Sequence, residues 1–175
     1  IDLDGVVTLN DNGLTVVSAG TVLVGDTVGG SGNLAVTSTL TDLDGAVTLT
    51  GSGTVTLDAT NLGANVTTAV GNVEFGGAVT VDKGSAASID TGSGAGKVDF
   101  KSTLGLTSGG LDSLSITAGT GDIDLDGVVT LNDNDLTVVS AGTVTVGSTI
   151  GGSGDLAVTT STLTDLNGAV TLTGS

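Results

Sequence analysis

The chain has 175 residues, of which 31 are Gly, and it contains no Cys, His, Pro, Met, Trp or Tyr. Its formal net charge is −16, because 19 acidic residues face only three lysines. This composition excludes a disulfide scaffold and any cysteine-based site, and it argues against nucleic acid and anionic lipid as partners.

Short runs of alternating apolar and polar residues follow one another from the first residue onward. A period of two predicts β-strands, and clusters of Gly, Asn, Asp and Ser between the runs predict turns. Such runs include LTVVSAG (14–20), LAVTSTL (34–40), VTLDAT (55–60) and SLSITAG (113–119), with turns such as NDNG (10–13) and VGGSGN (28–33). No segment shows a helical period, so we expect an all-β fold.

One short motif recurs through the chain. The intervals between the starts of its copies fit one or two turns of a coil in the size range of solenoid repeats. The sequence therefore predicts a parallel β-solenoid of stacked coils with roughly 20 residues per coil. An array of β-sandwich domains is the alternative. The copies are DLDGVVTL (2–9), DLDGAVTL (42–49), EFGGAVTV (74–81), DFKSTLGL (99–106), DLDGVVTL (124–131) and DLNGAVTL (165–172).

A longer repeat contains the short motif. Residues 1–52 begin IDLDGVVTLNDNGLTVVSAGTV, and residues 123–175 begin IDLDGVVTLNDNDLTVVSAGTV, an offset of 122. We interpret residues 1–175 as one continuous repeat region, with a long repeat at 1–122 and a partial second copy at 123–175. Such similarity between neighbouring copies predicts that the chain is an excerpt of a longer tandem array.

The stretches GDIDLDGVVTLNDNDLTV, AGTVTVGSTIGGSGDLAV and SLSITAGTGDI resemble the β-strand repeats of giant bacterial surface proteins, the filamentous-haemagglutinin-type and autotransporter adhesins. The resemblance covers essentially the whole chain and rests on the style of the repeat. It implies a β-solenoid that is secreted to the cell surface and acts in adhesion, aggregation or biofilm matrix. It carries no binding residues that can be transferred to this chain.

One stretch has the acidic spacing of a cation-binding loop. In DIDLDGVVTLND (122–133), Asp122, Asp124 and Asp126 occupy alternate positions and Asp133 lies eleven residues after Asp122, as in an EF-hand loop that ends in Asp. The flanking helices are missing and the intervening residues continue a strand, so an exposed strand face that ends in a turn is the simpler interpretation. Calcium bound between aspartates of neighbouring coils is the alternative, with Asp122, Asp124 and Asp126 as candidate ligands.

The only cations, Lys83, Lys97 and Lys101, cluster in the middle of the long repeat near Asp82 and Asp99. We expect ordinary exposed ion pairs, which are worth a few tenths of a kcal/mol. A contact with an acidic face of another subunit and an intramolecular Lys–Asn or Lys–Asp crosslink are the alternatives.

The two aromatic residues, Phe75 and Phe100, occupy the motif position of Leu3, Leu43 and Leu125. That position points inward in the expected strand, so the sequence predicts that both rings pack in the core and do not anchor a partner.

Other functions have less support in the sequence. Threonine pairs such as Thr54/Thr56 and Thr143/Thr145 suggest an ice-binding face, but their spacing is uneven. Most acid–base and nucleophilic residue types are missing, so we expect the chain not to be an enzyme.

We therefore expect a structural protein, the shaft of a secreted bacterial surface fibre or adhesin. Its expected partners are copies of itself and, as an alternative, a host or neighbouring-cell surface. We expect no cofactor apart from the calcium alternative, no nucleic acid, and no membrane insertion of this segment, since it contains no run of 18 apolar residues. A stalk that does not assemble, or a calcium- or ice-binding solenoid, remains open at this point.

Overall fold

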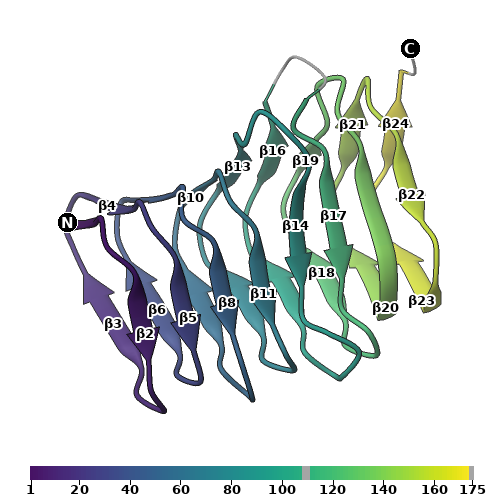
Figure 1. Ribbon diagram of the computed structural model, residues 1–175. Coiled ribbons are helices and arrows are strands. Elements are labelled where there is room, and N and C mark those ends of the chain that lie inside the picture. Colours follow the sequence, from purple (N-terminus) through teal and green to yellow (C-terminus); the bar gives the residue numbers. More distant parts are fainter. Residues whose placement is uncertain (108–110, 174–175) are drawn as a thin grey trace.

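The computed structural model describes residues 1–107 and 111–173, and every regular element within these ranges is a β-strand. Neighbouring strands pair in parallel, each with the strand one coil before or after it (Figure 1). The strands fall on three faces in the fixed order A, B, C, so that each coil adds one strand to each face. The prediction of an all-β parallel solenoid is confirmed.

The strands of each face are as follows. Face A contains β1 (Asp2–Leu3), β4 (Thr21–Val24), β7 (Leu40–Leu43), β10 (Thr60–Leu62), β13 (Val79–Val81), β16 (Leu104–Leu106), β19 (Val129–Thr130), β21 (Ile150–Gly152) and β24 (Val170–Leu172). Face B contains β2 (Val7–Leu9), β5 (Val28–Gly30), β8 (Val47–Leu49), β11 (Val66–Thr68), β14 (Ala87–Asp90), β17 (Leu114–Thr117) and β22 (Leu156–Val158). Face C contains β3 (Leu14–Val17), β6 (Leu34–Thr37), β9 (Val55–Leu57), β12 (Val73–Phe75), β15 (Val98–Phe100), β18 (Ile123–Leu125) and β23 (Ser161–Leu166). The long strand β20 (Leu136–Val146) runs around the corner from face B to face C.

The coils differ in length at their corners and much less in their strands. Thr41 lies opposite Thr60, whereas Val79 lies opposite the more distant Leu104, so the coil that starts at Val79 is the longer of the two. The extra residues of the longer coil lie in the corners at 82–86 and 91–97. The two coils lie on either side of the predicted average of roughly 20 residues per coil.

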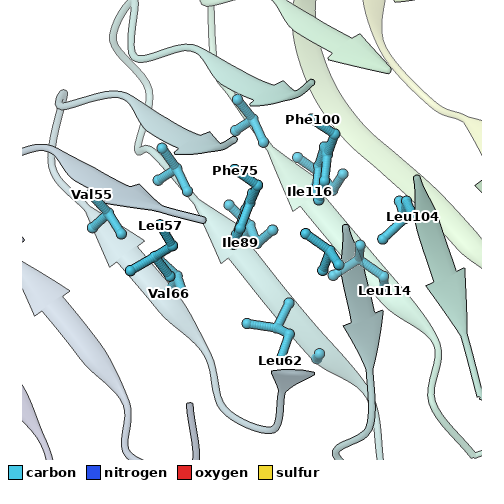
Figure 2. Close-up of a cluster of buried hydrophobic side chains, with 14 of the residues drawn as sticks. Val55, Leu57, Leu62, Val66, Phe75, Ile89, Phe100, Leu104, Leu114 and Ile116 are labelled. Atoms are coloured by element: carbon cyan, nitrogen blue, oxygen red, sulfur yellow. The ribbon is translucent and has the colours of Figure 1, made fainter. Parts of the chain in front are cut away.

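Inward-pointing residues of successive coils stack in rows along the axis. On face C one row contains Val36, Leu57, Phe75, Phe100 and Leu125, joined in this order by the strand register. The two phenylalanine rings stack with centroids 4.9 Å apart and an interplanar angle of 14° (Figure 2). Both side chains are buried, so the prediction that they pack in the core is confirmed. The core is otherwise aliphatic.

Four threonines are also buried, and their hydroxyl groups are satisfied at the corners. Thr91 Oγ1 donates to the carbonyl oxygen of Gly96 at 2.7 Å, and Thr68 Oγ1 donates to that of Gly71 at 2.5 Å. Buried polar groups need such partners. Because these hydroxyl groups have them, the threonines can be buried at the corners without destabilising the core. The four are Thr41, Thr60, Thr68 and Thr91.

Glycine follows the acidic residue of the motif because the corner of the preceding coil lies directly against it. A Cβ atom on Gly45 would lie 2.0 Å from the carbonyl oxygen of Asp26 in the preceding coil. Gly5 has the same place in the first copy of the motif, where no coil precedes it in the structure, and a Cβ there would meet nothing within 4 Å. The absence of a side chain at this position therefore allows neighbouring coils to stack.

The two copies of the long repeat lie on different faces of the solenoid. Strand β1 is on face A, but its counterpart in the second copy, β18, is on face C. Likewise β2 and β8 are on face B, whereas their counterparts β19 and β24 are on face A. Since β1 and β18 are 17 strands apart and each coil has three, the long repeat spans five and two-thirds coils.

This arrangement corrects one detail of the sequence interpretation. The motif at 42–49 turns the corner from face A to face B, but the motif at 74–81 turns the corner from face C to face A. The interval between the starts of these two copies is therefore not a whole number of turns. The same motif fits either corner because it meets similar neighbours at both.

The stacked phenylalanines provide a test of the core. We expect Phe100→Ala to lower the free energy of unfolding by about 3–5 kcal/mol, because it leaves a cavity between Phe75 and Leu125 in the buried row. Phe100→Leu should lower it by less than about 1.5 kcal/mol, since Leu125 occupies the next position of the row. Urea unfolding followed by circular dichroism measures both, and equal losses would contradict the stacked row.

The corner glycines provide a matched pair of variants. We expect Gly45→Ala to lower the free energy of unfolding by about 1–3 kcal/mol, because the new methyl group meets backbone atoms that cannot move aside. Gly5→Ala, in the same motif, should change it by no more than about 0.5 kcal/mol. If both variants unfold at the same urea concentration as the parent chain, the close approach of the coils is wrong.

Candidate functional site

Acidic and basic side chains meet in one half-buried strip on the outer side of face C. Glu74, Asp99 and Asp124 point outward from β12, β15 and β18, and the register places them side by side on consecutive coils. Paired strands are about 4.8 Å apart, so three carboxylates in such a row repel one another. Lys97 and Lys101 flank the row. We call these five residues the ion-pair ladder.

The lysines of the ladder neutralise this repulsion by linking neighbouring coils. Lys101 Nζ lies 2.7 Å from Oε1 of Glu74, one coil away. Lys97 Nζ contacts the carboxylate of Asp124, one coil in the other direction, and lies 3.7 Å from Oδ2 of Asp99. Both lysine side chains are more than a third exposed, so water weakens these pairs.

Asp99, at the centre of the ladder, is less favourably placed than its neighbours. Burial raises the pKa of its carboxyl group; the charge of Lys97 opposes that rise, and the charge of Asp126 adds to it. Its buried Oδ1 atom accepts no hydrogen bond from any residue that the structure describes. By contrast, the hydrogen bond to Asp124 raises the pKa of Lys97, and the hydrogen bond to Glu74 raises that of Lys101. The strip therefore contains two satisfied cations and one poorly solvated acid.

Two of the three lysines, Lys97 and Lys101, form ion pairs as the sequence predicts. Lys83 is different, because its Nζ donates to Oδ1 of Asn65 and to the carbonyl oxygen of Ala86, both at 2.8 Å. Asn65 is exposed, so this pair lacks the buried, aromatic-lined pocket that a Lys–Asn crosslink requires. A role of the lysines in contacts between subunits stays a prediction.

Of the candidate calcium ligands, Asp124 lies in β18 and Asp122 and Asp126 lie just before and just after it, and the three do not converge in this fold. Asp124 points outward from the strand and pairs with Lys97, while Oδ1 of Asp122 accepts the amide proton of Thr143 from the next coil. Same-face residues of a strand lie roughly 6–7 Å apart. Asp126 follows at the corner. A calcium ion between Asp99 and Asp124 would have to compete with the ammonium group of Lys97.

The EF-hand alternative does not match the local structure. Residues Ile123–Leu125 form an extended strand on face C, whereas Asp133 lies beyond β19, past the next face. Asp133 has a φ of 66° and its amide donates to Oγ of Ser153 on the following coil. The acidic positions that would share one ion are thus separated by a strand and a corner.

The outward threonines do not form an unbroken rank. On face B the outward row contains Thr48 and Thr67 on adjacent coils, but Gly29 precedes them and Asp90 follows. On face C the ion-pair ladder interrupts the corresponding row, since Thr56 is followed by Glu74. This irregular surface gives no support to the ice-binding alternative.

No cavity or cleft opens among residues 1–107 and 111–173. Within the same ranges, no group of three or more acidic residues is placed to share a metal ion. The described residues also form no helix that could cross a membrane. What the surface does offer is strand edges, acidic corners and the ladder.

Comparisons with family models, with curated protein sequences and with solved structures find no match to this chain.

The ladder was not predicted from the sequence, although a signal for it exists. Aligning the motif copies EFGG (74–77), DFKS (99–102) and DLDG (124–127) places Glu74, Asp99 and Asp124 in one column. In a parallel solenoid one such column becomes a row of side chains if the copies are one coil apart. These three copies satisfy this condition, because the register pairs Glu74 with Asp99 and Asp99 with Asp124.

The raised pKa of Asp99 predicts how stability depends on pH. A carboxyl group that binds its proton more readily in the folded state destabilises the fold when it is charged, and this effect disappears as the pH falls through the folded-state pKa. We therefore expect Asp99→Asn to raise the melting temperature at pH 7, by an amount that shrinks on acidification. Calorimetry at a series of pH values measures the effect.

The matched control is Asp165→Asn, which removes an exposed carboxylate from the same outward row of face C. Its effect on the melting temperature should be smaller at neutral pH. A lower melting temperature for Asp99→Asn at pH 7 would show that the attraction between Asp99 and Lys97 outweighs the burial of the carboxylate.

Proposed function

We propose that this chain is a structural repeat, the shaft of a secreted bacterial surface fibre or adhesin, and that copies of it associate into an extracellular filament or matrix. The observation that carries the proposal is the unbroken pairing of coil on coil from β1 to β24. About eight coils at 4.8 Å each make a rod roughly 40 Å long. The resemblance of the repeats to those of bacterial surface proteins supports the extracellular location.

The backbone gives the solenoid its mechanical strength. Every coil interface has hydrogen bonds on three faces, for example from Val47 N to Asn65 O at 3.0 Å and from Val55 N to Asn72 O at 2.9 Å. Stretching the rod along its axis loads these bonds together with the packing of the aliphatic rows. Because each coil contacts only its neighbours, stability accumulates along the stack. A tandem array of such coils is suited to span distance.

The surface chemistry suits a rod that stays dissolved while it assembles. A net charge of −16 keeps separate rods apart at low ionic strength. Salt screens charges that lie more than about 10 Å apart at 0.1 M, so association is expected to strengthen as ionic strength rises. Divalent ions would add a bridging contribution between acidic corners of neighbouring rods, in line with the calcium alternative.

The test is electron microscopy of the purified chain at increasing salt, once with excess calcium and once with EDTA. We expect filaments or bundles in both conditions, at salt concentrations of about 0.15 M, where charges on separate rods are largely screened. Filaments that form with excess calcium but not with EDTA would show that acidic residues bridged by calcium form the contact between rods. Isolated rods in all conditions would contradict self-association and favour a stalk that presents a separate tip.

A further inference from the structure

We infer that the outer side of face A, from β10 to β24, is a docking surface for the same surface of a second copy of this chain, with the two rods antiparallel. The inference deepens the proposed self-association and rests on it, since it names the contact through which rods join side by side. The surface lies on the flank of the rod, so coils stacked before or after the described ones would not cover it.

The outer side of face A is uncharged over six coils, although the net charge of the chain is −16. Face B is interrupted by Asp90, and face C carries the ion-pair ladder. Like charges on two rods repel, so an uncharged flank allows the closest approach. Its middle row contains Asn61, Thr80, Gly105, Thr130, Gly151 and Thr171.

A second row runs beside the first and is formed by the residue that precedes each of the six strands. All six of these residues are uncharged, and Val128 is an exposed apolar one, at 42 %. We call the two rows together the neutral face. A partner on this face would cover Val128 without burying a carboxylate.

The differences between the two copies of the long repeat remove charge beside this surface. Strands β2, β5 and β8 on face B correspond to β19, β21 and β24 on face A. Asp26 and Asp44 precede β5 and β8, but their counterparts before β21 and β24 are Ser148 and Asn167. The neutral face thus borders a corner with two carboxylates fewer than the equivalent part of face B.

The middle row is complementary to itself when its order is reversed. A two-fold axis parallel to the strands, midway between β16 and β19, makes β13 of one copy face β21 of the other, and β16 face β19. Thr80 then meets Gly151, and Gly105 meets Thr130, so each threonine lies over a glycine. Gly105 leaves room for it, because a Cβ atom there would lie 4.0 Å from its nearest neighbour.

The same axis brings opposite charges together along the corner between faces C and A. Lys101 precedes β16 and Asp126 precedes β19, so each lysine faces the aspartate of the other copy. Both side chains are exposed, that of Lys101 to 46 %. Asp58, before β10, meets Asn167, which stands where the first copy of the repeat has Asp44. No two carboxylates face each other along this corner.

Parallel rods lack both matches. Each coil would face the same coil of the second copy, which places Thr80 against Thr80 and Gly105 against Gly105. The corner before a strand would also meet the corner after it, so Asp126 would approach Asp133 on the far side of β19. Like charges opposite one another are destabilising, and the antiparallel arrangement avoids them.

The size of the neutral face predicts a weak contact that gains strength by repetition. Six coils about 4.8 Å apart and two rows about 6.6 Å apart give roughly 400 Å² on each copy. The pair then buries roughly 800 Å² in total, about half of a standard interface. In a tandem array each further long repeat starts on another face, as β1 and β18 do. Neutral faces would then point to all three sides, and their contacts would add.

Crosslinking tests the register, because the chain has no native cysteine. We expect T80C/G151C to give a covalent two-chain product with a bismaleimide that spans about 10 Å, the spacing of packed sheets. Within one rod the two positions are three coils apart, about 14 Å, which exceeds that span. T80C alone and G151C alone should give no such product. Dimers from either single variant would overturn the antiparallel register, and no dimer from the double variant would overturn the docking.

Exchanging threonine and glycine tests the complementarity. Gly105→Thr sets one threonine against another across the contact, so association should weaken at least about tenfold. The double variant G105T/T130G exchanges the two roles and should associate about as strongly as the parent chain. Gly29→Thr makes the same change on face B and should have no effect. Sedimentation velocity at about 0.15 M salt measures association, and circular dichroism checks the fold. A folded double variant as weak as Gly105→Thr would overturn the pairing.

The outcomes separate this inference from the proposed function. If the parent chain assembles and Gly105→Thr assembles equally well, copies join through another surface, which retains self-association and overturns docking through the neutral face. A parent chain that stays monomeric at its highest soluble concentration would contradict both proposals.

Discussion

Hydrogen bonding between each strand and its neighbour one coil away is the interaction on which the rest of this molecule depends. A short strand such as β8 or β12 has no stability alone, and it exists because two similar strands lie on either side of it. This requirement explains the composition. Proline would remove an amide proton from the stack, and side chains at the tightest corner positions would separate the coils, as the approach of Gly45 to Asp26 shows.

The inner and outer rows respond differently to stacking. In the inner rows, the stacking of similar side chains stabilises the core, because aliphatic side chains and the pair Phe75 and Phe100 pack directly upon one another. Outside, the same rule places like charges together, and an acidic protein accumulates repulsion on every coil. The ion-pair ladder is the place where two of the three lysines offset it, and Asp99 marks the position where the compensation is incomplete.

Much of the fold could be predicted from the sequence because its signals are local. Alternation in stretches such as Val47–Leu49 specifies a strand, and Asp-Gly specifies a corner, whatever lies elsewhere in the chain. The assignment of motif copies to corners could not be predicted, because the corner at Gly45 and the corner at Gly77 are built from nearly the same residues. The partners of Lys97 and Lys101 were also inaccessible, since they depend on which strands become neighbours and not on distance along the chain.

The advance of five and two-thirds coils per long repeat has a consequence for the shape of any tandem array. The coils with extra corner residues at 82–86 and 91–97 are bulkier than the others, and a bulge that always recurred on one side would curve the shaft. Because each further copy starts on a different face, the bulges of three consecutive copies point in three directions. Their bending contributions cancel, so such a shaft is straight on average and resists bending equally in every direction.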